Sequence, residues 1–118
     1  LGGPGVGKGT QCEKIVHRFD AWCHISAGDC LREEQQDPKS VDGEIINACI
    51  KEGAIVPSGV TVKLLQKAMD SRLASGRRCF LIDGFPRNLE NDSTFRSEIR
   101  NEFEVVGVLF FQASEHEL

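Results

Sequence analysis

The sequence predicts an α/β fold with a doubly wound parallel sheet, and two observations lead to this prediction. Residues 79–82 and 105–111 are apolar runs that do not alternate with polar residues. Such runs are typical of strands that are buried on both faces of a parallel sheet. Stretches with helical periodicity lie before and between them, as expected of strand–helix–strand crossovers.

A glycine-rich segment opens into the first predicted helix. Five of the twelve glycines fall within the first nine residues, which indicates a loop with an unusual backbone. Cys12, Ile15, Val16 and Phe19 then recur at i, i+3, i+4 and i+7. This spacing places them on one apolar face of an amphipathic helix.

The next segment predicts a strand followed directly by a helix. Residues 22–26 (WCHIS) are typical of a short buried strand, and residues 27–36 of a polar helix. The helix is expected to end before Asp37 and Pro38, because a proline disfavours helical geometry in the residue that precedes it.

A second short helix is predicted from Ser40 to Gly53. Ser40 is a good N-cap residue, and Gly53 suits the left-handed position after a helix end. The expected apolar face consists of Val41, Ile45, Ala48 and Cys49. The two short helices predict a small helical subdomain at about residues 27–56, within a single domain that spans residues 1–118.

Two more helices are predicted further along the chain. The first follows a turn at residues 56–59 and ends at Gly76. Its apolar positions are Val62, Leu65, Met69 and Leu73. The second is polar overall and lies between the two apolar runs. Its apolar positions are Phe95, Ile99 and Phe103.

The composition restricts the partners that the chain can bind. Its 118 residues include 18 acidic and 14 basic side chains, which give a net charge of -4. This balance argues against a basic surface for polymeric nucleic acid or for anionic membranes. No apolar run approaches the roughly 18 residues of a membrane span. Any anion must therefore be bound by a local arrangement of groups.

The five cysteines are interpreted as reduced core thiols of an intracellular protein. They form no C-x-x-C pair and have mostly apolar neighbours in the sequence. The three histidines show no metal-ligand spacing with them, so the linear sequence does not favour a metal site at the cysteines.

Residues 2–8 (GGPGVGK) match the G-x-x-x-x-G-K pattern of a phosphate-binding loop at the start of a helix. Such a loop turns backbone N–H groups toward an anion, and Lys8 adds a full positive charge. The pattern normally continues with Ser or Thr, whereas here Gly9 intervenes and Thr10 carries the hydroxyl. A flexible glycine turn beside a surface lysine is the structural alternative.

Three charged residues downstream are candidates for the same site. Asp83 follows a buried strand at its carboxyl end, where doubly wound proteins bind ligands. Arg87 comes directly after a rigid Phe-Pro step, and Arg32 lies in the predicted helix at residues 27–36. Both arginines could bind phosphate oxygens in a bidentate manner. The alternatives are a turn-capping Asp83 and solvated surface arginines.

Four motifs together resemble the nucleoside monophosphate kinase family, most closely its UMP-CMP kinase branch. They are LGGPGVGKGTQ, HISAGDCLR, EGAIVP and DGFPRN, in this order. The resemblance implies a P-loop NTPase fold with a mobile helical domain over the monophosphate. It also implies a fragment that lacks most of the first strand, the lid and the C-terminal part, and that is inactive or nearly so by itself.

The resemblance also implies roles for individual residues. Lys8, Arg32 and Arg87 are the expected catalytic residues, and Asp83 is expected to reach Mg²⁺ through water. The implied ATP-binding residues are Gly5, Val6, Gly7, Lys8, Gly9 and Thr10. The implied monophosphate-binding residues are Arg32, Ala54, Ile55, Val56, Gly84, Phe85, Pro86, Arg87 and Asn91.

Asn91 bears on which monophosphate is accepted. Adenylate kinases, which the sequence also resembles, carry a glutamine at this position to read adenine, so Asn91 favours UMP or CMP as the acceptor and ATP as the donor. The alternative interpretation of Asn91 is a helix N-cap. An adenylate kinase acting on AMP and a non-catalytic nucleotide-binding module remain the alternative functions. The family further implies a monomer in the cytoplasm, with the nucleus as a second compartment.

Overall fold

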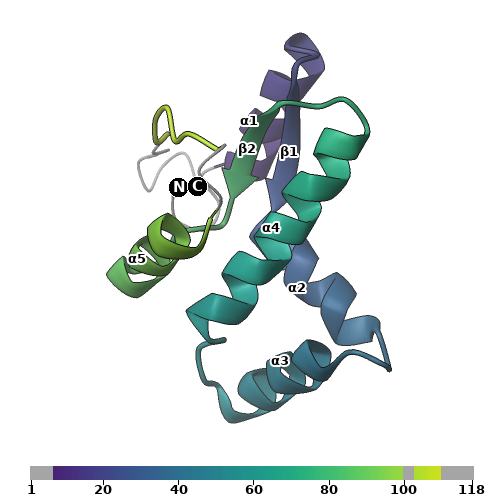
Figure 1. Ribbon diagram of the computed structural model, residues 1–118, viewed down its shortest axis with the longest axis vertical. Helices are drawn as coiled ribbons and strands as arrows, with labels where there is room; N and C mark the ends of the chain where they lie inside the picture. The colour runs from purple at the N-terminus through teal and green to yellow at the C-terminus, as the bar shows by residue number, and fades with distance from the viewer. Residues whose placement is uncertain (1–6, 100–102, 110–118) are drawn as a thin grey trace.

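The computed structural model describes residues 7–99 and 103–109, which contain five helices and two strands (Figure 1). In chain order the elements are α1 (Lys8–Arg18), β1 (Trp22–Ser26), α2 (Ala27–Gln36), α3 (Val41–Glu52), α4 (Ser58–Ala74), β2 (Cys79–Asp83) and α5 (Leu89–Glu98). The predicted order of helices and strands is confirmed as far as β2 and α5.

The two strands pair in parallel, with Trp22 opposite Cys79 and Ser26 opposite Asp83. The crossover between them consists of α2, α3 and α4, and α4 packs on one face of the strands while α1 lies on the other (Figure 1). Parallel strands joined by helices, with helices on both faces, form the α/β architecture that the sequence predicts.

The core lies between the strands and α4. Leu65 is fully buried there, together with Val62 and Met69 from the same helix and Ile25 from β1. Phe95, Ile99 and Phe103 pack against the edge of this cluster. With 17 residues, α4 is the longest described helix, but no helix in the described segments is both long and apolar enough to cross a membrane.

Local capping signals account for the bounds of α2 and α3. The Ser26 hydroxyl accepts a hydrogen bond from the backbone N–H of Asp29 (3.2 Å), and Ser40 does the same for Gly43 (2.9 Å). These bonds satisfy N–H groups that have no partner within the helix. Gly53 ends α3 with φ 68, a left-handed conformation that glycine adopts without steric cost. The predicted helix bounds are confirmed here.

The predicted apolar face of α3 is wrong. Val41 and Ile45 are exposed, and the buried residues of this helix are Gly43 and Ile46. The helix packs against α2 through its smallest residue, because a Cβ at Gly43 would overlap the backbone carbonyl oxygen of Glu34. Counting apolar side chains therefore misses the contact face.

The predicted strand at residues 105–111 is also not found in its described part. Residues 105–109 form no strand, and Val105, Val106 and Val108 are exposed. An unalternating apolar run becomes a strand when layers cover both of its faces, and these side chains lie uncovered. The remaining two residues of the run, 110 and 111, lie outside the described part.

The close approach at Gly43 predicts a specific effect of an added methyl group. Gly43→Ala should lower the free energy of unfolding by about 1–3 kcal/mol, because α2 and α3 must move apart. Gly59→Ala in α4 is the matched control: a Cβ there meets nothing within 4 Å, so stability should rise by about 0.5–1 kcal/mol. Urea unfolding measures both, and equal effects would contradict the close α2–α3 contact.

Candidate active site

The parallel register and the position of α1 bring three charged or titratable groups together near the carboxyl ends of the strands. Because Ser26 pairs with Asp83, both strands end at the same edge, and α1 begins nearby. Asp83 Oδ1 lies 3.4 Å from the Lys8 ammonium, and Asp83 Oδ2 lies 3.2 Å from His24 Nε2. A lysine and a histidine therefore flank one carboxylate from two sides.

The Asp83 carboxylate is largely buried, with 11% of its side chain exposed. Its Oδ1 atom is buried and has no hydrogen-bond partner among the described residues. The 3.4 Å contact with Lys8 is an ion pair, but it is longer than the roughly 2.7–2.9 Å of a charge-assisted hydrogen bond. Oδ1 thus keeps acceptor capacity for a further ligand, and the carboxylate faces Lys8 and His24 instead of capping the turn at Gly84.

The described start of α1 suits an anion. Gly7 precedes the helix with φ 82, and as the N-cap residue it has no side chain to cap the first turn. Gly9 and Thr10 are exposed, and Lys8 is half-buried toward Asp83. The backbone N–H groups of a first turn without a cap, together with the helix dipole, favour a phosphate. The remaining predicted loop residues, Gly5 and Val6, lie outside the described part.

Arg87 and Arg32 lie at the same edge as Asp83. Arg87 is exposed, and its Nε donates a hydrogen bond to the Gly84 carbonyl (3.1 Å). A Cβ at Gly84 would lie 4.0 Å from Ala27, and the adjacent Gly28 lies beneath the Arg32 guanidinium. Arg32 forms an exposed ion pair with Asp29. Because exposed pairs contribute only about 0–1 kcal/mol, a phosphate can compete for this guanidinium.

Asn91 lies in the first turn of α5 and is 6% exposed. Its Oδ1 accepts the backbone N–H of Arg87 (3.0 Å), and its Nδ2 donates to the Ser58 hydroxyl (2.7 Å). Its own backbone N–H donates to Asn88 Oδ1 (2.7 Å), so Asn88 is the N-cap of α5. The interpretation of Asn91 as the N-cap is therefore wrong.

The remaining residues that were predicted to bind the monophosphate lie in two loops. Ala54 and Ile55 are exposed and Val56 is half-buried between α3 and α4, two residues before Ser58, whose hydroxyl contacts Asn91. The structure thus connects this loop to Arg87 through Ser58 and Asn91. The loop after β2 contains Gly84 with φ 81, a buried Phe85 and a half-buried Pro86 in a cis peptide bond.

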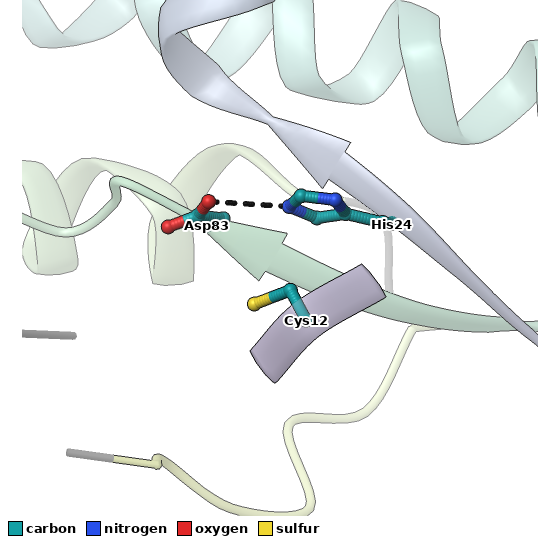
Figure 2. A group of neighbouring side chains, drawn as sticks. All are labelled: Cys12, His24 and Asp83. Carbon is teal, nitrogen blue, oxygen red and sulfur yellow. Dashed lines mark hydrogen bonds and ion pairs between the residues drawn. The ribbon is translucent and has the colours of Figure 1, made fainter. Parts of the chain in front are cut away.

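Sequence reasoning did not single out Cys12 and His24, which lie beside Asp83, or Ser58, which contacts Asn91. The atoms Cys12 Sγ, a ring nitrogen of His24 and an Asp83 oxygen all lie within 4.8 Å of one another (Figure 2). Burial raises the pKa of the Cys12 thiol, and the nearby Asp83 charge raises it further. Strand parity was the available signal, because His24 lies two residues before Ser26, the partner of Asp83, and so faces the same side of the sheet.

A hollow lies away from this edge, between α2, α3 and α4. Both lysines that line it pair with acidic lining residues, Lys63 with Asp42 (2.9 Å) and Lys67 with Glu34 (3.8 Å), and the third acidic residue, Asp70, accepts a hydrogen bond from Gln66 (3.0 Å). The hydrogen bond to Asp42 raises the pKa of Lys63. Since both lysines of the hollow already pair with carboxylates, the Asp83 oxygen without a hydrogen-bond partner in the described part and the start of α1 make the carboxyl edge of the sheet the better candidate site.

A glycine-opened helix beside a carboxylate at the end of a parallel strand is typical of P-loop NTPases. An adenylate kinase family model matches residues 1–118. The chain belongs to the adenylate kinase family, whose members include enzymes named as kinases.

Several curated relatives are similar to this chain. A UMP-CMP kinase of Xenopus laevis is 48% identical over 113 residues, which are 94% of this chain and 58% of the relative. A human UMP-CMP kinase is 46% identical over 97% of the chain and 59% of the relative. A uridylate kinase of Schizosaccharomyces pombe is 50% identical over 99 residues, which are 84% of this chain and 52% of the relative. The chain therefore spans a little over half the length of these relatives.

The buried amide of Asn91 predicts a structural cost when it is removed. Asn91→Ala should lower the free energy of unfolding by about 1–3 kcal/mol, because it leaves the Arg87 N–H without its acceptor and Ser58 without its donor. Ser93→Ala, on the exposed face of the same helix, is the control and should change stability by less than about 0.5 kcal/mol. Indistinguishable urea midpoints for the two variants would contradict the bridging role of this amide.

Proposed function

We propose that the protein is a nucleoside monophosphate kinase that transfers the γ-phosphoryl group of ATP to UMP or CMP. The observation that carries the proposal is the juxtaposition of Lys8 and Asp83 at 3.4 Å, beside a helix start that is open to phosphate. The names of the relatives, UMP-CMP kinase and uridylate kinase, support the pyrimidine acceptor.

The chemistry requires positive charge and positioning more than a general base. Phosphoryl transfer passes through a loose transition state, with negative charge on the equatorial oxygens of the migrating group. Lys8 follows this group, while Arg32 and Arg87 hold the acceptor phosphate. The common edge of the two arginines and Asp83 supports this division of roles.

The residues present fit a magnesium ion that accompanies ATP. Asp83 Oδ1 is a buried carboxylate oxygen without a hydrogen-bond partner in the described part of the chain, and Mg²⁺ prefers oxygen ligands. Asp83 would hold the ion through water. When bound, Mg²⁺ supplies positive charge that offsets the charge of the phosphates.

Asn91 is proposed to read the acceptor base from a fixed position. Its amide is oriented by Arg87 and Ser58, yet an amide oxygen has a second lone pair and an amide nitrogen has a second hydrogen. The rigid amide can therefore still bind a base edge. The loop of Ala54, Ile55 and Val56, which leads to Ser58, would line the base and ribose.

AMP is the second candidate acceptor, because the matching family model describes adenylate kinases. The donor site and the phosphate-binding arginines would be the same, and only the base contacts near Asn91 would differ. We further propose a monomer in the cytoplasm, with the nucleus as a second compartment, in the phosphorylation of pyrimidine nucleotides.

An acceptor panel tests the proposal. Transfer from Mg-ATP to UMP, CMP, dCMP and AMP is measured with the chain and with a chimera in which the remaining segments of the Xenopus laevis relative are joined to it. We expect the chimera to prefer the pyrimidine acceptors and the chain alone to be nearly inactive. If AMP is the best acceptor, the proposed acceptors UMP and CMP are wrong. If the chimera transfers no phosphoryl group to any acceptor, the proposed kinase activity is wrong.

Lys8→Ala in the same chimera tests the donor site. Loss of the charge on the migrating group should reduce kcat by about 100-fold or more, with little effect on monophosphate binding. Lys14→Ala, an exposed lysine on the same helix, is the matched control and should leave kcat unchanged. Equal turnover in the two variants would show that Lys8 does not take part in phosphoryl transfer.

A further inference from the structure

Three side chains with metal-binding atoms meet beneath the start of α1. Cys12 comes from α1, His24 from β1 and Asp83 from the end of β2, as Figure 2 shows. Ile25 and Ile82 point to the α4 face of the sheet and join its core cluster. The alternating His24 and Asp83 point to the opposite face, where α1 places Cys12.

We propose that Cys12, His24 and Asp83 form a binding site for Zn²⁺. A thiolate, an imidazole and a carboxylate are the three side-chain types that bind this ion. Tetrahedral zinc places two nitrogen or oxygen ligands about 3.4 Å apart, and a sulfur about 3.6 Å from either of them. His24 Nε2 and Asp83 Oδ2 are 3.2 Å apart, and all three ligand atoms lie within 4.8 Å of one another. Small side-chain rotations therefore bring the three ligand atoms to the separations that zinc requires.

The charges of the site suit zinc better than magnesium. Binding displaces the proton of the Cys12 thiol to solvent, and the resulting thiolate and the Asp83 carboxylate together balance the two charges of the ion. Magnesium prefers oxygen ligands and has little affinity for a thiolate, whereas zinc accepts sulfur and nitrogen. Cys12 is 4% exposed, so its sulfur is shielded from bulk water.

Zinc at this site would weaken the contact between Lys8 and Asp83. The ion and the Lys8 ammonium would share the same carboxylate, with zinc on the His24 side and Lys8 on the other. Two positive charges on one carboxylate repel each other, which weakens the Lys8–Asp83 contact. On the basis of the proposed function, zinc therefore inhibits phosphoryl transfer by withdrawing Asp83 from the nucleotide site.

Cobalt titration tests the site independently of activity. Co²⁺ substitutes for zinc, and a cysteine ligand gives it a sulfur-to-metal absorption band in the near ultraviolet. The 118-residue chain, reduced with a phosphine, should bind one Co²⁺ with this band and release it when one equivalent of Zn²⁺ is added. Cys12→Ala should abolish the band and weaken zinc binding by about 100-fold. Circular dichroism verifies that each variant is folded.

Cys30→Ala is the matched control, because Cys30 is a half-buried thiol on α2 outside the cluster. It should retain the band and the zinc affinity, whereas His24→Gln should weaken binding by about tenfold or more. A band that survives in Cys12→Ala and disappears in Cys30→Ala would overturn the site. Absence of zinc binding at micromolar concentration would overturn it as well.

The inhibition is measured separately with the kinase chimera. Zinc should reduce transfer in the unmodified chimera and have at least tenfold less effect in its Cys12→Ala form. Zinc binding through Cys12 without any effect on turnover would overturn the inhibition while the site stands. A chimera that transfers no phosphoryl group without zinc contradicts the proposed function, and the cobalt band still decides the site.

Discussion

The parallel pairing of β1 and β2 is the constraint on which the rest of the structure depends. Its register sets Ser26 opposite Asp83, so both strands end at one edge. The helix that follows β1, the loop that follows β2 and the start of α1 therefore meet at the same place. A slip of β2 by one residue relative to β1 would turn Asp83 to the α4 face, away from His24, and would turn Ile82 toward α1 instead.

The carboxylate of Asp83 is the chemical centre of this edge. A buried charge is unfavourable unless partners compensate it, and here Lys8 and His24 approach it from two sides. Neither contact satisfies Oδ1 with a hydrogen bond. Oδ1 therefore keeps hydrogen-bonding capacity in the described structure, as the proposed binding and release of charged ligands requires. The same property would allow the proposed magnesium and zinc ions to compete for Asp83.

A chain of hydrogen bonds connects the loop after β2 with the loop before α4, where we propose that the acceptor monophosphate binds. Asn91 receives the Arg87 N–H and donates to Ser58, which begins α4. The loop that leads to Ser58 follows α3. The loop after α3 is therefore linked to Arg87 through hydrogen bonds between neutral groups, one buried and one partly buried, whose strength depends little on salt.

Local signals made much of the fold predictable, while contacts between distant elements did not follow from the sequence. The bounds of β1 and α2 and the capping role of Ser40 depend on neighbouring residues, and all three are confirmed. The contact face of α3 depends on a glycine that fits against Glu34, which no count of apolar residues shows. The meeting of Cys12 with His24 requires the strand register and the position of α1 together.

The most direct test of this account is the backbone amide spectrum of the ¹⁵N-labelled chain during titration with Mg-ATP. The account predicts shifts at residues 7–10, at the start of α2 and in the loop after Asp83, with little change along α3. Shifts confined to the α2–α3–α4 hollow around Lys63 and Lys67 would place the nucleotide elsewhere and contradict the assignment of the carboxyl edge as the active site.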